Sequence, residues 1–81
     1  MKLVELTEYL VKSIAKEPDM VSVKQFEDDE DYLTIQVLVS AEDMGRVVGK
    51  GGSVANSIRT LVQAAAYINK EKKVKINIDS F

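Results

Sequence analysis

The stretch VVGKGGSVANSI, residues 47–58, decides the fold of this 81-residue chain. Two valines precede the tetrad GKGG at residues 49–52, and a helical apolar pattern resumes at Val54. Glycine ends helices because it adopts backbone angles that other residues resist. The stretch therefore predicts a short helix, a tight loop and a longer helix.

Two nucleotide-binding motifs with similar glycines do not fit this stretch. A phosphate-binding P-loop needs a glycine at position 44 and a hydroxyl residue after Lys50, where the chain has Met44 and Gly51. A dinucleotide-binding fingerprint needs a glycine at position 54, which is Val54. The motif that remains is Gly-x-x-Gly between two helices.

The residues on both sides of the stretch show helix and strand patterns in a simple order. Helical patterns cover residues 3–16, 41–47 and 53–69. Strand patterns cover residues 20–26, 32–39 and 73–79. Pro18 ends the first helix, and Ser40 is a suitable N-cap for the second. The order α-β-β-α-α-β predicts a single α+β domain over residues 1–81.

The predicted strands assemble into a mixed sheet. The first two form an antiparallel hairpin, and the two helices between the second and third strands allow a parallel, right-handed crossover. This gives a three-stranded sheet with three helices on one face and an exposed second face. The second strand turns one apolar face to the helices: Leu33, Ile35, Val37 and Val39. The long helix has this apolar face: Val54, Ala55, Ile58, Leu61, Val62, Ala65 and Ile68.

The composition excludes several classes of protein. The chain has no cysteine and no histidine, so it lacks disulfides, thiolate metal sites and the commonest general base. We therefore expect no cofactor, no metal site and no enzymatic activity. No apolar run approaches the roughly 20 residues of a membrane span, and the N-terminus lacks a signal-peptide core. We expect a small soluble protein of the cytoplasm that does not bind membranes.

Five consecutive acidic residues, at positions 27–31, follow the first predicted strand. Such a run cannot be buried, so it predicts an exposed hairpin loop. A calcium-binding EF-hand loop needs alternating ligands, a central glycine and a distal glutamate, which this run lacks.

Charge is divided unevenly along the chain. Residues 1–43 carry four lysines and eleven acids, a net charge of −7, whereas residues 44–81 carry seven basic residues and two acids, a net charge of +5. This separation favours one surface that attracts a polyanion and another that repels it. Chance clustering of solvated charges explains the same pattern equally well.

The GKGG loop is suited to holding a sugar–phosphate backbone. Gly49 and Gly52 allow a tight turn and let a ligand approach the main chain without meeting a Cβ. The loop leads into the N-terminus of the long helix, where N–H groups and the helix dipole attract anions. Lys50 adds positive charge at the tip, and Arg46 and Arg59 flank it. A plain corner between two helices would have the same glycines.

Residues 45–52, GRVVGKGG, and 58–66, IRTLVQAAA, resemble the type II KH (K-homology) domain and, over essentially the whole chain, the small stand-alone bacterial KhpA family. The resemblance implies a protein that clamps about four nucleotides of single-stranded RNA. It implies that the tetrad holds phosphate and sugar. The residues implied to line an apolar groove for the bases are Val47, Val48 and Val54, with Ile35 or Val37. Some of these residues must instead belong to the core, and alternation does not tell which. The candidate RNA-binding residues are Arg46, Val47, Val48, Gly49, Lys50, Gly51, Gly52, Ser53, Val54 and Arg59.

The resemblance also implies partners. Members of this family form homodimers and pair with a larger KH protein of the KhpB or Jag type, in RNA regulation, as RNA chaperones, and in control of cell shape and cell-wall organisation. Relatives often carry polar or basic residues where this chain has Gly51 and near Ser53, so this loop is softer and less cationic. The alternative is a protein-interaction subunit with a KH fold and weak or no RNA affinity, which a pI of about 5.0 favours.

Overall fold

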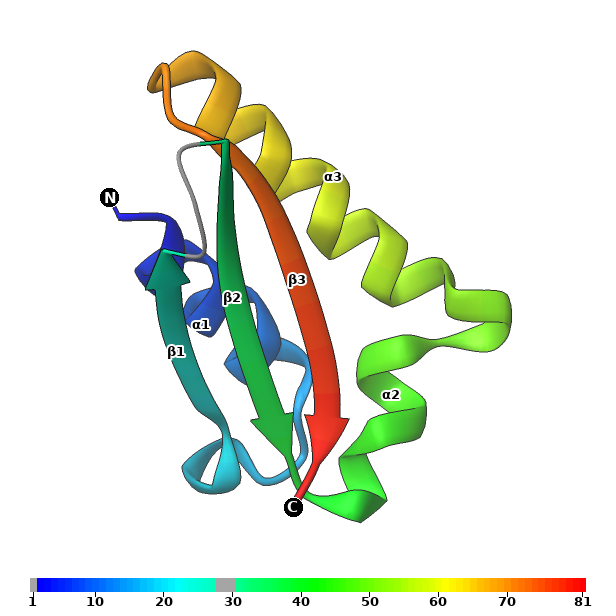
Figure 1. The fold of residues 1–81 in the computed structure, drawn as a ribbon. Helices are drawn as coiled ribbons and strands as arrows, with labels where there is room; N and C mark the ends of the chain where they lie inside the picture. Colours follow the sequence, from blue (N-terminus) through cyan, green and yellow to red (C-terminus); the bar gives the residue numbers. More distant parts are fainter. Residues whose placement is uncertain (1, 28–30) are drawn as a thin grey trace.

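Strand β2 (Tyr32–Val39) lies at the centre of a three-stranded sheet (Figure 1). The structure is a computed structural model that describes residues 2–27 and 31–81. Strand β1 (Ser22–Glu27) is antiparallel to β2, and strand β3 (Lys73–Ser80) is parallel to it. The predicted hairpin, parallel crossover and mixed sheet are therefore confirmed.

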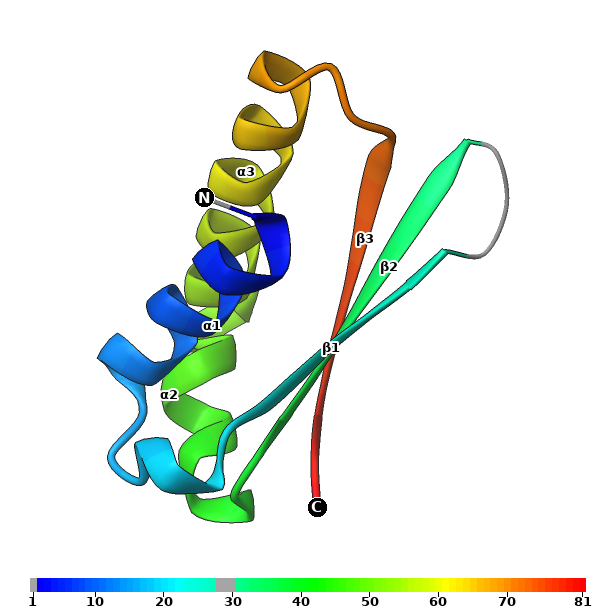
Figure 2. The same cartoon turned by 90° about the vertical axis from the view of Figure 1, so that its left-hand side faces the viewer.

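Three α-helices lie on one face of this sheet (Figure 2). They are α1 (Leu3–Ile14), α2 (Met44–Val48) and α3 (Ser53–Ile68). Three short 3-10 turns, Pro18–Met20, Ala41–Asp43 and Lys50–Gly52, connect the elements. The first of these turns delays the start of β1 by two residues, and the second replaces the first half of the helix predicted at residues 41–47. The order of elements and the one-sided layering agree with the α+β prediction.

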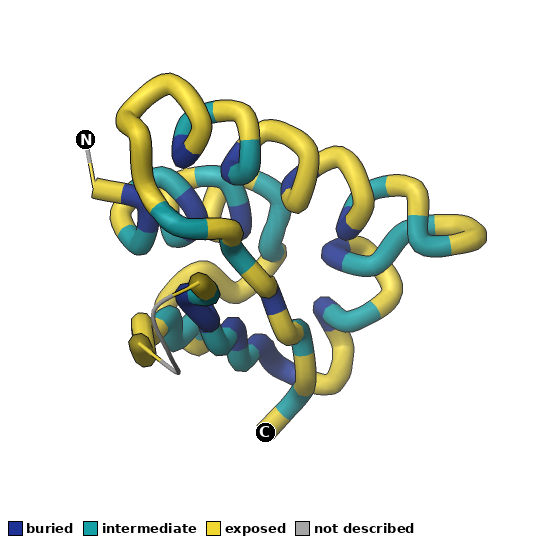
Figure 3. The backbone as a smooth tube through the Cα atoms, turned by 45° about the horizontal axis from the view of Figure 1, so that its top comes forward, coloured by how far each residue is buried: buried dark blue, intermediate teal, exposed yellow. Residues whose placement is uncertain are grey.

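The core lies between β2 and the helices. The inward side chains of β2 are at most 4% exposed, as the alternation predicts: Leu33, Ile35, Val37 and Val39. The helices and β3 contribute these buried partners: Leu3, Val11, Val47, Ile58, Val62, Ala66 and Ile76. The buried positions follow the inner side of each helix (Figure 3). Burial of these apolar side chains is the main source of stability in a domain of this size.

The buried stripe of α3 differs from the predicted apolar face at three positions. Leu61 is 54% exposed and Ile68 is 75% exposed, whereas Ala66 is fully buried. The buried residues of α3 recur at steps of three and four: Ala55, Ile58, Val62 and Ala66. Leu61 and Ile68 lie outside this stripe on the helix surface, because each turn of the helix advances by 3.6 residues. They belong to an apolar surface that the rest of the domain does not cover.

The acidic run is only partly described. Glu27 is the last residue of β1, and its carboxylate lies 3.7 Å from Lys72 Nζ. Asp31 precedes β2, and its carbonyl accepts the N–H of Lys73 at 3.2 Å. Residues 28–30, which carry most of the predicted loop, lie outside the described residues.

Asp43 joins the end of α1 to the start of α2. It is 1% exposed, and its carboxylate accepts the N–H groups of Lys16 and Glu17, both at 2.9 Å. These two N–H groups bind Asp43 and not the carbonyls of α1. The helix therefore ends at Ile14, two residues before the end that the sequence pattern predicts. The Ser40 hydroxyl accepts the N–H of Asp43 at 3.3 Å, so the predicted N-cap is confirmed.

These contacts also shift the pKa of Asp43. The N–H of Lys16, followed by that of Glu17, lowers this pKa below its ordinary value of 3.8. Ser40 and the charge of Arg46 lower it further, whereas burial opposes the shift. The pKa of Asp43 is lower in the folded protein than in the unfolded protein. Its ionised carboxylate therefore stabilises the fold at pH values above the pKa of the unfolded state. That contribution is lost as pH falls through the folded pKa.

Replacing Asp43→Asn should lower the melting temperature at about pH 7 more than at about pH 3, since the wild-type carboxylate is ionised at the higher pH. Thermal melts followed by circular dichroism at both pH values measure the difference. Glu42, the exposed neighbour of Asp43, serves as the control. Glu42→Gln should have the melting temperature of the wild type at both pH values. An equal loss for Asp43→Asn at both pH values would contradict this role.

Candidate nucleic-acid interface

The GKGG loop connects α2 to α3 with three glycines in the left-handed half of backbone space. Gly49 has a φ of 78°, Gly51 of 63° and Gly52 of 80°. The Gly49 N–H donates to the Gly45 carbonyl at 2.9 Å, and the Gly52 N–H donates to the Gly49 carbonyl at 3.1 Å. These bonds close α2 and form the 3-10 turn. Three left-handed conformations within four residues favour glycine strongly.

Gly49 is also required for steric reasons. A Cβ at this position would lie 2.5 Å from Cγ2 of Val54 and 2.8 Å from its backbone nitrogen. The first turn of α3 therefore packs directly against the end of α2. A Cβ at Gly51 would meet nothing within 4 Å, so the tip of the loop is open to a ligand.

The loop leads into an N-terminus of α3 that has no side-chain cap. The N-cap residue is Gly52, which has no side chain to accept a hydrogen bond, and the N–H of Ser53 donates to the Lys50 carbonyl. The first N–H groups of a helix lack helical partners and carry the positive end of the dipole. Lys50 and Ser53 are exposed beside this end of the helix. The arrangement offers N–H donors, one ammonium group and an open backbone to an anion.

The structure separates the candidate valines into core and surface. Val47 is fully buried, so it supports the loop from the core and its side chain does not line an open groove. Val48 and Val54 are half-buried beside the loop. Ile35 and Val37 are both fully buried. Both therefore belong to the core, because β2 is the central strand and the helices cover its inward side chains.

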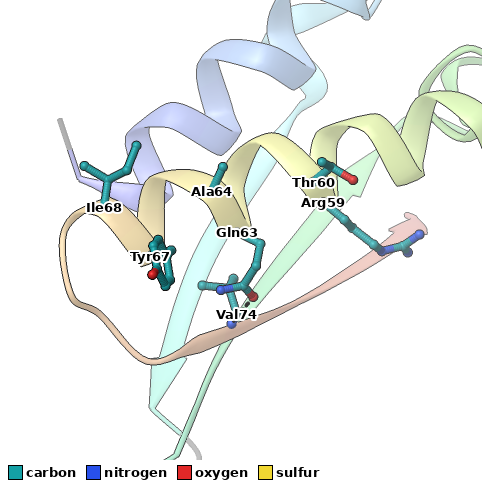
Figure 4. Close-up of a pocket in the computed structure, with 7 residues that line it drawn as sticks. All are labelled: Arg59, Thr60, Gln63, Ala64, Tyr67, Ile68 and Val74. Atoms are coloured by element: carbon teal, nitrogen blue, oxygen red, sulfur yellow. Dashed lines mark hydrogen bonds between the residues drawn. The ribbon is translucent and has the colours of Figure 1, made fainter.

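β3 is the edge strand of the sheet that lies next to α3. A groove of about 740 Å³ lies between this strand and the C-terminal half of α3 (Figure 4). It is lined by Arg59, Thr60, Gln63, Ala64, Tyr67, Ile68 and Val74. Tyr67 and Ile68 are 83% and 75% exposed, so the groove is open and partly apolar.

Two side chains of α3 bind the outer edge of β3 in this region. Arg59 Nε donates to the Ile76 carbonyl at 3.3 Å, and Gln63 Oε1 accepts the Val74 N–H at 2.9 Å. Arg59 Nη1 also donates to Asn56 Oδ1 at 3.1 Å. Arg59 thus connects α3 to β3, whereas Arg46 is an exposed residue of α2 next to the loop. The two arginines predicted to flank Lys50 lie on different elements.

Sequence reasoning missed most of the groove. Gln63, Tyr67 and Val74 belong to segments that were predicted as helix and strand without a role in binding. The available signal was the topology, because a crossover that ends in a third strand places that strand at the edge beside the long helix. In residues 2–27 and 31–81, no group of acidic side chains could hold a metal ion. No helix of this part of the chain is long and apolar enough to cross a membrane.

Comparison with solved structures supports the fold. Aquifex aeolicus Era bound to GDP and aluminium fluoride matches 98% of this chain with a TM-score of 0.71 and 16% sequence identity. Era in complex with MgGDPNP and a segment of 16S ribosomal RNA matches 96% of it with a TM-score of 0.65 and 18% identity. This chain covers 30% and 29% of those two Era chains. At this level of identity, the match concerns the fold alone.

Comparison with sequences identifies the family. The RNA-binding protein KhpA of Clostridium perfringens is 43% identical over 91% of this chain and 96% of its own length. The KhpA proteins of Listeria monocytogenes and Thermotoga maritima are 43% and 35% identical over 91% and 89% of this chain. A family model described as the KH domain of KhpA and KhpB matches residues 4–78. The chain therefore belongs to the KhpA/KhpB family of KH-domain proteins.

Proposed function

We propose that this protein binds single-stranded RNA through the GKGG loop and acts as an RNA chaperone or post-transcriptional regulator without enzymatic activity. The observation that carries the proposal is the combination of an open glycine loop and an uncapped N-terminus of α3. The relatives named RNA-binding protein KhpA support RNA as the ligand. The cytoplasm, where RNA is made and translated, is the proposed location.

The loop suits the RNA backbone more than the bases. Gly51 presents main chain without a side chain, and a Cβ there would meet nothing within 4 Å, so a phosphate can approach the loop closely. Lys50 supplies a positive charge at the same point, and Arg46 lies on the preceding helix. Contacts of this kind position a nucleic acid, while base contacts specify its sequence.

The bases have a separate place in this proposal. Val48 and Val54 form a half-buried apolar surface beside the loop, and the groove between α3 and β3 continues along the same helix. In that groove, Gln63 and Arg59 offer amide and guanidinium groups beside apolar carbon. KH domains hold about four nucleotides in this way, with the Gly-x-x-Gly loop on the backbone. The RNA backbone would thus bind at the N-terminal end of α3, and the bases would bind farther along the same helix.

Replacing Lys50→Asp and Gly51→Asp together should leave the fold intact and remove detectable binding of a short oligouridine of about four nucleotides, the length that one KH domain holds. The two carboxylates repel phosphate, and aspartate is among the residues that tolerate the left-handed conformation at position 51. Fluorescence anisotropy with a labelled oligouridine measures the affinity, and circular dichroism checks the fold.

The matched control for this experiment is Lys12→Asp with Ser13→Asp, which changes the charge equally on the exposed surface of α1. The control should bind RNA close to the wild-type level. A folded loop variant that binds as tightly as the wild type would show that the loop is only a corner between helices.

Replacing Lys50→Ala should weaken binding to all sequences by a similar factor. One lost phosphate contact should reduce the slope of log affinity against log salt by about 0.7, the value for single strands. A titration from about 50 mM to about 200 mM salt measures this slope. Base preference should not change, and a variant that alters preference among homopolymers while keeping the slope would contradict a phosphate contact.

We further propose that the protein forms a homodimer, or a heterodimer with a larger KH protein of the KhpB type, through the outer surface of α3. Leu61 is more than half exposed on this helix and does not line the groove beside β3. A 9.0 kDa domain has a small core and gains stability when a second copy covers apolar surface. This surface also favours the alternative function, that of a protein-interaction subunit with little RNA affinity.

Static light scattering at tens of micromolar protein should give twice the mass of one chain. Leu61→Glu should return the protein to a monomer, because burial of a carboxylate in an apolar interface is costly. Tyr9→Glu, at an exposed position of α1, is the control and should remain dimeric. A wild-type protein that stays monomeric at high concentration would overturn self-association.

A further inference from the structure

The three helices cover one face of the sheet and leave the other face open (Figure 2). The strand register places aromatic and basic side chains on this open face. Strand alternation places the apolar residues of β2 inward, so their neighbours in sequence point to this open side. Six residues of this open side form what we call the sheet face: Lys24, Phe26, Tyr32, Gln36, Lys73 and Lys75. None of them belongs to the GKGG loop or to the groove beside α3.

The register of the three strands brings these side chains into neighbouring rows. Tyr32 lies opposite Lys73, and Phe26 and Lys75 lie on either side of Thr34. The next row consists of Lys24, Gln36 and Asn77. Neighbouring strands are about 4.8 Å apart, and residues two apart in a strand are about 6.8 Å apart. The two aromatic rings are thus diagonal neighbours at the spacing within which long side chains interact.

The contacts within the sheet face position its charged and aromatic groups. Lys75 Nζ lies 4.3 Å from the centre of the Tyr32 ring. Thr34 is only 9% exposed although it is on the open side, so its neighbours cover it. Phe26 is nevertheless 51% exposed. A half-exposed aromatic ring beside an ordered ammonium group offers a base a stacking surface and its phosphate a partner.

We propose that the sheet face is a second binding surface for single-stranded RNA, in which Phe26 stacks on a base, Tyr32 holds the Lys75 ammonium in place, and the lysines bind phosphates. The proposal shares its ligand with the proposed function and uses different residues. Stacking on exposed aromatic side chains within a positively charged groove is the general chemistry of single-strand binding. Gln36 and Asn77 add amide groups that can donate to and accept from base edges.

The outward side chains of the strands carry more positive than negative charge, although the acidic run of residues 27–31 joins β1 to β2 beside Phe26 and Tyr32. Lys24, Lys73 and Lys75 point outward, against Asp79 at the opposite end of β3. Glu27 lies at an inward position of β1 by alternation, and its carboxylate is close to Lys72. A second copy of the chain packed face to face would bring lysines against lysines, which disfavours self-association here. Single-stranded RNA offers phosphates to the lysines and bases to the aromatic ring of Phe26.

The test compares two double variants in the full chain. Phe26→Leu with Lys75→Gln removes one ring and one charge from the sheet face and keeps apolar and polar side chains of similar size. Tyr9→Leu with Lys12→Gln makes the matching change on α1, where both residues are exposed. Fluorescence anisotropy with a labelled 12-nucleotide oligouridine measures both, in the wild-type background and with Lys50→Asp and Gly51→Asp present.

We expect the sheet-face variant to bind roughly tenfold more weakly, because one stacked base contributes about that factor, and the salt slope to fall by about 0.7. The α1 variant should match the wild type. The loop variant should keep residual binding to the long oligonucleotide at low salt, and the added sheet-face changes should remove it. Ultraviolet crosslinking of the wild type should attach RNA to the peptides that contain Phe26 or Tyr32, a readout that does not depend on folding of a variant.

Three outcomes would overturn the proposal. Wild-type affinity in the sheet-face variant, with crosslinks confined to the loop, leaves the loop as the RNA site and excludes the sheet face. An equal loss in the α1 variant shows a nonspecific charge effect. A change of mass in light scattering without a change in RNA affinity identifies a protein interface. Loss of binding in the sheet-face variant alone, with a fully active loop variant, would instead support the sheet face and reject the proposed loop site.

Discussion

The parallel pairing of β3 with β2 is the constraint on which the rest of the structure depends. Two parallel neighbours cannot be joined by a tight turn, so the chain between them must cross the sheet, and here it does so as α2, the GKGG loop and α3. Together with α1, this crossover covers one face of the sheet. It places β3 at an edge beside α3 and leaves the other face without helices. Both proposed RNA surfaces follow from this single connection.

Within the crossover, the contact of Gly49 with Val54 fixes the position of the loop. The two helices meet so closely that no side chain fits at Gly49, and the next glycines must then turn the chain in left-handed conformations. At the other end of α2, Asp43 anchors the helix to the end of α1 through two backbone N–H groups. The loop is thus held between two fixed points, which suits a site that binds through main-chain groups.

The distribution of charge explains how an acidic protein can bind RNA. The segment with a net charge of +5 forms α2, the loop, α3 and β3, while the segment with a net charge of −7 contains α1, β1 and the acidic run. The overall pI of about 5.0 averages over two segments of opposite net charge. Local potential at the ligand, more than net charge, decides whether a polyanion binds.

The sequence predicted the elements well because periodicity reports which side of an element is buried. It placed β2 correctly to the residue and found the loop, since glycines and alternation are local signals. It did not distinguish Val47, in the core, from Val48, beside the loop, because adjacent apolar residues in a short helix have no clear period. It also missed Asp43 as a buried anchor, since its partners lie 26 and 27 residues away. The groove between α3 and β3 depends on such distant contacts too.

The most direct measurement of the central claim, that main-chain groups of the loop hold the RNA backbone, is a nuclear magnetic resonance titration. A uniformly 15N-labelled protein would be titrated with a short oligouridine at low salt. The account predicts that the amide signals of residues 49–54 shift first and most strongly, while those of α1 stay unchanged. Saturable shifts elsewhere, with the signals of residues 49–54 unmoved, would contradict it.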